Sequence, residues 1–139
     1  MKKYYAVIDT NVLVSSMLKW DSIPGKVIGL VLQGTIIPLL SEEILVEYTA
    51  VLDRNKFGFA DNAVERLLAQ FREKAVYLSR TKTNEAFFDR DDIVFFEIAL
   101  SGRSTMDAYL VTGNLKHYPI RNYVVTPRQM IEIIEGDSD

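Results

Sequence analysis

The chain has 139 residues, of which 48% are hydrophobic and 25% are charged, and this predicts one globular domain with a sizeable core. It has no cysteine and a single histidine, His117, which excludes disulfides, thiolate nucleophiles and metal sites rich in cysteine or histidine. The net charge of −3 does not indicate the basic surface of a typical nucleic-acid-binding protein, but acidic residues gathered around a cation would make that figure a poor guide.

No segment has the pattern of a targeting signal or a membrane span. The apolar run after Lys2 and Lys3 is interrupted by Asp9, which argues against a signal peptide. The longest apolar region, residues 27–40, contains Pro38 and is too short to cross a bilayer. We therefore expect a cytoplasmic protein that does not contact a membrane.

Apolar and β-branched runs alternate with helical patterns along the chain. Strands are predicted at residues 4–8, 35–40, 75–78, 107–113 and 123–126, and helices at 12–20, 26–32, 42–53, 62–74, 92–100 and 127–134. Ser41 and Asp61 are predicted to cap the two helices that follow them. This alternation, without a hairpin signal or a flexible linker, predicts an α/β fold in which residues 1–139 form a single domain around a parallel sheet with helices on both faces.

Four polar side chains are predicted to meet at the carboxyl edge of that sheet. Asp9 ends the first strand, Glu47 lies on the helix after the second, Asp92 begins a later helix, and Asn114 follows the fourth strand. Oxygen ligands from separate elements, without histidine or cysteine nearby, suit a hard cation such as Mg²⁺ or Mn²⁺. Such an ion activates water, so the chemistry indicated is phosphodiester hydrolysis.

Each of these residues also has an ordinary structural interpretation. Asp9 is alternatively a helix cap, although Thr10 and Asn11 also have capping chemistry. Glu47 follows Glu43 by one helical turn, a spacing typical of a solvated face.

The polar residues around the later strands also leave alternatives open. One acid of the run 89–92 is expected to be only a helix cap, and Asp107, which precedes a strand, is interpreted as structural. Thr112 either binds a phosphate or a neighbouring acid or simply shapes a turn. Lys116 is a candidate contact for a nucleic-acid backbone, whereas His117 is interpreted as a surface or packing residue.

Four segments together resemble the PIN-domain ribonucleases, in particular the branch of toxin components of toxin–antitoxin pairs. They are Val7–Ser15 (VIDTNVLVS), Ser41–Tyr48 (SEEILVEY), Asp89–Asp92 (DRDD) and Asp107–Asn114 (DAYLVTGN), and their order and spacing span nearly the whole chain. The resemblance implies a three-layer α/β/α fold with a central parallel sheet. It also implies an acidic pocket that binds Mg²⁺ or Mn²⁺, with single-stranded RNA as the usual substrate.

The resemblance assigns the family's catalytic, metal-binding acids to Asp9, Glu47 and Asp92. The family often has Asp at the fourth ligand position, where this chain has Asn114. Asn keeps an oxygen ligand but lacks the charge, so a second metal ion should bind more weakly. Among the other shared positions, Asn11 and Ser15 are expected to orient the Asp9 carboxylate and its loop.

The sequence therefore predicts a metal-dependent endoribonuclease, the toxin of a toxin–antitoxin pair. Thr112 and Asn114 would help to position water or phosphate, and Lys116 would steer the RNA. Resemblance alone implies a homodimer and an antitoxin that covers the pocket.

Two alternatives remain open at this point. One is a weakly active or inactive PIN-fold module that binds RNA or protein, which the uncharged Asn114 favours. The other is a Mg²⁺-dependent phosphatase, although a haloacid-dehalogenase mechanism wants a second Asp where Asn11 stands.

Overall fold

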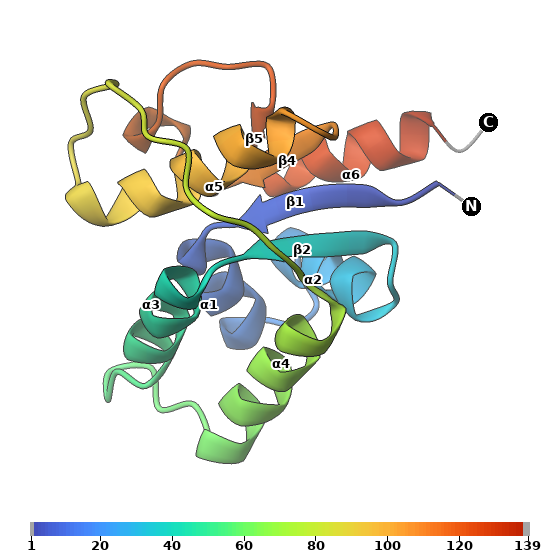
Figure 1. Ribbon diagram of the computed structural model, residues 1–139. Helices are drawn as coiled ribbons and strands as arrows, with labels where there is room; N and C mark the ends of the chain where they lie inside the picture. The colour runs from blue at the N-terminus through green and yellow to red at the C-terminus, as the bar shows by residue number, and fades with distance from the viewer. Residues whose placement is uncertain (1, 138–139) are drawn as a thin grey trace.

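A computed structural model describes residues 2–137 and has a five-stranded, fully parallel sheet at its centre (Figure 1). The strands lie in the order β3-β2-β1-β4-β5. Their bounds are β1 Tyr4–Ile8, β2 Ile36–Leu40, β3 Val76–Tyr77, β4 Ala108–Val111 and β5 Val124–Val125. The first strand of the chain is therefore the middle strand of the sheet.

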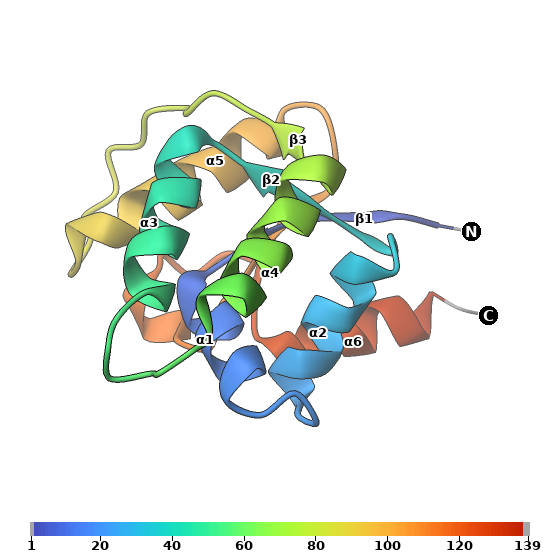
Figure 2. The ribbon, with the colours of Figure 1, turned by 90° about the horizontal axis from the view of Figure 1, so that it is seen from below.

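Six α-helices of the described residues cover the two faces of this sheet. They are α1 Thr10–Leu18, α2 Ile23–Leu32, α3 Glu42–Leu52, α4 Asp61–Lys74, α5 Ile93–Arg103 and α6 Pro127–Gly136, with short 3₁₀ turns η1 Arg90–Asp92 and η2 Leu115–His117. Helix α5 packs on one face, against β1, β2 and β4, while α2 and α4 contact β2 from the other face and α1 and α6 pack on α2 (Figures 1 and 2). This arrangement confirms the predicted three-layer α/β/α fold. No helix within residues 2–137 is both long enough and apolar enough to span a bilayer.

The apolar sequence of β1 follows from its central place. Ala6, Val7 and Ile8 are fully buried because strands flank β1 on both sides and helices cover both faces. In the register of β1 and β4, Ile8 is opposite Val111, and the Asp9 N–H donates to the Val111 carbonyl at 2.9 Å. Both strands therefore end at the same level, which brings the residues that follow them close together.

The helix starts agree only in part with the sequence. Ser41 caps α3 as predicted, since its hydroxyl accepts a hydrogen bond from the Ile44 N–H at 3.3 Å. The prediction that Asp61 caps α4 is wrong. The helix begins at Asp61 itself, after Ala60, whose carbonyl accepts from the N–H groups of both Ala63 and Val64. Asp61 instead places its charge in the first turn, where the helix dipole favours it.

A long irregular segment, residues 78–89, connects β3 to η1, and we call it the strap. The predicted loop within it, residues 79–88, has no helix or strand. The strap is fastened to α5 by Glu97, a buried residue of that helix. The Glu97 carboxylate accepts hydrogen bonds from Arg80 Nε and from the Thr83 N–H, both at 2.7 Å. The strap is therefore fixed to α5 despite its irregular backbone.

Helix α5 also approaches the sheet closely at Gly102. A Cβ at this position would lie 2.8 Å from the Ala108 Cβ and 3.0 Å from Leu39 Cδ1, distances that the packed core cannot absorb without a shift. We expect Gly102→Ala to lower the free energy of unfolding by about 1–2 kcal/mol, because overpacking outweighs the higher helix propensity of alanine. Urea denaturation measures the change.

Gly29 in α2 provides the matched control for this prediction. A Cβ there meets nothing within 4 Å, so Gly29→Ala should raise the free energy of unfolding by about 0.5–1 kcal/mol. Equal effects of the two substitutions would contradict a close contact between α5 and the sheet.

Candidate active site

A pocket of about 360 Å³ lies at the carboxyl edge of the sheet, where β1 ends. Acidic side chains from three parts of the chain line it. Asp9 comes from the end of β1, Glu47 from α3, and three more from the segment that leads into α5: Asp89, Asp91 and Asp92. The structure thus brings the three predicted acids, Asp9, Glu47 and Asp92, to one pocket.

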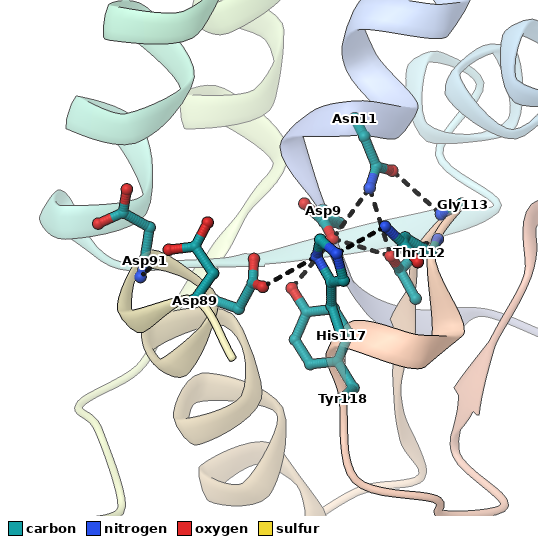
Figure 3. A network of polar contacts seen from close by, with 10 residues as sticks. Asp9, Asn11, Asp89, Asp91, Thr112, Gly113, His117 and Tyr118 are labelled. Carbon is teal, nitrogen blue, oxygen red and sulfur yellow. Dashed lines mark hydrogen bonds and ion pairs between the residues drawn. The ribbon is translucent and has the colours of Figure 1, made fainter. Parts of the chain in front are cut away.

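Asp9 is buried, with 6% of its surface exposed, and its carboxylate is held by side chains from the first turn of α1 and from the connection between β4 and β5. Its Oδ2 atom accepts hydrogen bonds from Thr112 Oγ1 at 2.8 Å, from the Tyr118 hydroxyl at 3.0 Å and from Asn11 Nδ2 at 3.2 Å (Figure 3). Three donors saturate this oxygen, so a metal ion or a further ligand would have to use Oδ1. The Asp9 side chain makes no capping hydrogen bond to α1, which argues against its interpretation as a simple helix cap.

Burial raises the pKa of Asp9 above its usual value, because desolvation disfavours the carboxylate. The hydrogen bonds from Thr112 and Tyr118 act in the opposite direction and stabilise the charged form. Burial therefore disfavours the charged form of Asp9, while the hydrogen bonds from its neighbours stabilise that form.

Asp92 is the second buried acid of the pocket, 9% exposed. Its Oδ2 atom lies 3.2 Å from His117 Nδ1, within ion-pair distance, but it accepts no hydrogen bond of normal geometry from the described residues. Burial, followed by the charges of Asp9 and Asp89, raises the pKa of Asp92 to about 6, and His117 opposes this rise. A buried carboxylate oxygen without a hydrogen bond, close to a like charge, is an arrangement that a bound cation would stabilise.

Glu47 is half-buried and faces the same pocket from α3. Burial and the charge of Asp91 raise its pKa, while Arg54, which also lines the pocket, lowers it. Glu43, one turn earlier, differs from it: it is exposed and pairs with Arg80 at 2.7 Å. The two glutamates therefore do not form one solvated face.

The chemistry of the pocket fits a hard cation, since five acidic side chains line it and one of their buried oxygens, Asp92 Oδ2, accepts no hydrogen bond from the described residues. Within residues 2–137, however, no group of three or more acidic or histidine side chains is drawn together closely enough to hold one ion directly. An ion would therefore bind a subset of Asp9, Asp92 and Glu47 and reach the others through water. Mg²⁺ keeps several waters in most protein sites, and this arrangement suits it.

The residues predicted to support the site occupy different places. Asn11 donates to Asp9 and accepts from the Gly113 N–H at 3.0 Å (Figure 3). It therefore links the start of α1 to the segment that follows β4. Ser15 lines the pocket. Thr112 is fully buried behind Asp9, outside the pocket lining.

Asn114 and Lys116 are not among the lining residues. The Asn114 amide Nδ2 lies 2.9 Å from His117 Nε2. With the amide nitrogen as donor, His117 Nε2 is the acceptor and the ring proton is on Nδ1, the nitrogen closer to Asp92. The contact with His117 uses the amide nitrogen, so Asn114 would bind an ion through Oδ1, from outside the pocket lining.

Several pocket residues were not identified from the sequence. His117, interpreted as a surface or packing residue, lines the pocket beside Asp92, and its spacing of three from Asn114 was the available signal. Tyr118 holds Asp9 from a loop that carries no recognisable pattern. Thr10 lines the pocket with a buried hydroxyl that has no hydrogen-bond partner among the described residues.

Comparison with known proteins assigns the family. Residues 5–116, which include Asp9, Glu47, Asp92 and Asn114, match the PIN domain. The protein belongs to the PIN-domain family. PIN domains are generally nucleases, so this chain is a member of a nuclease superfamily.

One relative of this PIN-domain protein is an uncharacterized protein of Methanocaldococcus jannaschii. The two sequences are 27% identical over 148 residues, which cover 96% of this chain and 93% of the relative. No solved structure matches the chain significantly.

The raised pKa of Asp92 predicts a pH-dependent stability of the metal-free PIN domain. The folded state binds this proton more tightly than the unfolded chain, so the charged group costs stability as the pH rises from about 4 to about 6. Asp92→Asn should therefore raise the free energy of unfolding at about pH 7.5 by at most about 3 kcal/mol, and should have little effect at about pH 4. Urea denaturation in EDTA at the two pH values tests this.

The control for this prediction is Asp107→Asn, because the Asp107 side chain is 90% exposed. It should change the stability little at either pH. A destabilised Asp92→Asn protein at neutral pH would contradict the unfavourable burial of this charge.

Proposed function

We propose that this PIN-domain protein is an endoribonuclease that hydrolyses RNA phosphodiester bonds with Mg²⁺ or Mn²⁺. The observation that carries the proposal is the pair of buried carboxylates, Asp9 and Asp92, in one pocket that Glu47 also lines. The pKa values of Asp9, Glu47 and Asp92 are all raised. Raised carboxyl pKa values are expected where several acids gather to bind a cation and the cation is not bound.

In the proposed mechanism, Asp9, Glu47 and Asp92 hold the ion, directly or through water. The ion, when bound, lowers the pKa of a coordinated water and polarises the scissile phosphate. Thr112, Tyr118 and Asn11 keep the Asp9 carboxylate charged and fixed in orientation. Asn114 would add a weak, uncharged ligand through Oδ1, while its amide nitrogen contacts His117.

The positive charges near the pocket would meet the RNA backbone. Arg54 lines the pocket, and Lys116 lies in η2 next to the pocket residue His117. Contacts of this kind release counterions from the polyanion, so RNA binding should weaken as the salt concentration rises.

A finer proposal is that the protein acts in the cytoplasm as the toxin of a toxin–antitoxin pair. Its support is the resemblance of the four acidic segments to that branch of the family, which also suggests a homodimer. An antitoxin would inhibit by covering the pocket. Expression with and without the protein encoded next to it tests this: growth arrest that the neighbour relieves supports the toxin role, and harmless expression of an active enzyme contradicts it.

The second candidate is a PIN-fold module that binds RNA without cutting it. Asn114 favours it, since this position lacks a charge and is not among the residues that line the pocket. RNA binding without any Mn²⁺-dependent cleavage would support this alternative.

The decisive test of the nuclease proposal is Asp9→Asn. We expect it to reduce Mn²⁺-dependent cleavage of single-stranded RNA by at least about 10³-fold, because it removes a charge that an activated water depends on. Circular dichroism should show an unchanged fold. Asp107→Asn, far more exposed, should cleave normally. Undiminished cleavage by Asp9→Asn in a clean preparation refutes the mechanism.

Tyr118→Phe tests the support of Asp9. Loss of the hydroxyl removes one of three donors to Asp9 Oδ2, and we expect kcat/KM to fall about 10- to 100-fold while the fold is retained. Tyr77→Phe, on an exposed tyrosine of β3, is the control and should have no effect. An equal loss in both variants would show that the tyrosine hydroxyl at position 118 has no specific role.

A further inference from the structure

Two consecutive phenylalanines at the end of the strap have opposite environments. The Phe87 ring packs against Phe96 and Tyr118, with ring centroids 5.5 Å and 6.2 Å apart. The Phe88 side chain is 93% exposed, among the most exposed large apolar residues of the described chain. An exposed aromatic ring next to a functional pocket is a candidate binding surface.

The exposed ring of Phe88 lies at the edge of the acidic pocket. It is stacked beside the His117 ring, at a centroid distance of 6.2 Å and an interplanar angle of 29°. His117 lines the pocket, and so does Asp89, the residue that directly follows Phe88. The Phe88 ring and the pocket are therefore parts of one surface.

The segment that presents Phe88 is fastened on both sides. Phe87 anchors it to the core, and Asp89 on the other side accepts a hydrogen bond from the Asp91 N–H at 2.9 Å. Glu85, earlier in the strap, is ion-paired with Arg121. The frame thus holds the Phe88 ring outward, so its exposure is a property of the fold.

We propose that Phe88 binds an unpaired nucleobase of the substrate by stacking, next to the phosphate held at the acidic pocket. This inference rests on the proposed nuclease function and names a specificity element for it. Carboxylates that hold a cation can bind the phosphate, but they make no stacking contact with a nucleobase. Proteins that bind single-stranded nucleic acids add aromatic side chains on which the bases stack. A base within a duplex cannot reach such a ring, so Phe88 favours single-stranded RNA.

The test is the affinity for a fluorescein-labelled single-stranded RNA, measured by anisotropy with Mn²⁺ in the Asp9→Asn background, in which cleavage is blocked. Stacking contributes about 1–3 kcal/mol per base, so F88A should raise the Kd about 5- to 150-fold. F88Y and F88W should bind like the parent. F88L, which keeps an apolar side chain without the ring, should bind as weakly as F88A.

Ile120 provides the matched control, since its side chain is 95% exposed and is not part of the pocket lining. Ile120→Ala should leave the Kd unchanged. If F88L binds like the parent, or if Ile120→Ala weakens binding as much as F88A, the surface acts through apolar area and the stacking proposal is overturned. Unchanged affinity of F88A also overturns it.

Abasic oligonucleotides locate the base. Removal of one base should weaken binding to the parent protein but add nothing in F88A, because both changes remove the same contact. Additive effects at every position overturn the proposal.

The stacking and nuclease proposals can fail separately. If the unsubstituted chain does not cleave RNA with Mn²⁺ but the stacking pattern holds, Phe88 binds a base in a non-cutting module. If the chain cleaves RNA and F88A leaves the KM unchanged, the nuclease proposal stands and the stacking proposal falls.

Discussion

The constraint on which the site depends is the burial of two carboxylates, Asp9 and Asp92, at the same edge of one sheet. Within residues 2–137, the side chains that donate to Asp9 Oδ2 are all neutral. Asp92 Oδ2 has His117 at ion-pair distance but accepts no hydrogen bond of normal geometry from these residues. Like charges in a partly desolvated pocket oppose folding unless something cationic joins them. The buried charge of Asp92 is thus unfavourable, and either protonation or a bound cation would relieve it.

The parallel sheet is what makes this arrangement possible. Because β1 and β4 end at the same level, the start of α1 meets the connection after β4, and Asn11, Thr112 and Tyr118 all reach the same oxygen of Asp9. Asp92, just before α5, reaches this edge of the sheet from the face that α5 covers. Glu47 reaches it from α3, the helix that follows β2. Each acid is therefore positioned by a different rigid element, which fixes the geometry better than a single loop would.

The fold could be predicted from the sequence because the patterns that indicate its strands and helices are local. The unbroken apolar run of β1 and the alternation of strands and helices require no knowledge of distant contacts. The same applies to Asp9, which is placed by the end of its own strand. Glu47 and Asp92 were also placed at this edge by the order of the elements, but spacing within one helix does not say what lies opposite, and the four motifs were needed to strengthen the assignment of Glu47.

Other parts of the site depend on contacts that no local pattern encodes. Tyr118 is separated from Asp9 by more than a hundred residues, and the position of its hydroxyl follows from the packing of Phe87 and the loop around it. The orientation of His117 depends on Asn114 and Asp92 together. The start of α4 shows the same limit on a small scale, because backbone geometry at Ala60 outweighed the capping preference of Asp61.

The attachment of the strap to α5 has a consequence for how the protein responds to its ligand. Glu97 fixes the strap to the same helix that begins just after Asp92, so the turn carrying Asp89, Asp91 and Asp92 is closed by one buried carboxylate. Any force that a cation exerts on this turn is transmitted along a short covalent path to the Thr83 amide and to Arg80. Occupation of the pocket should therefore stiffen the strap, and slower solvent exchange of its amide protons would record the change.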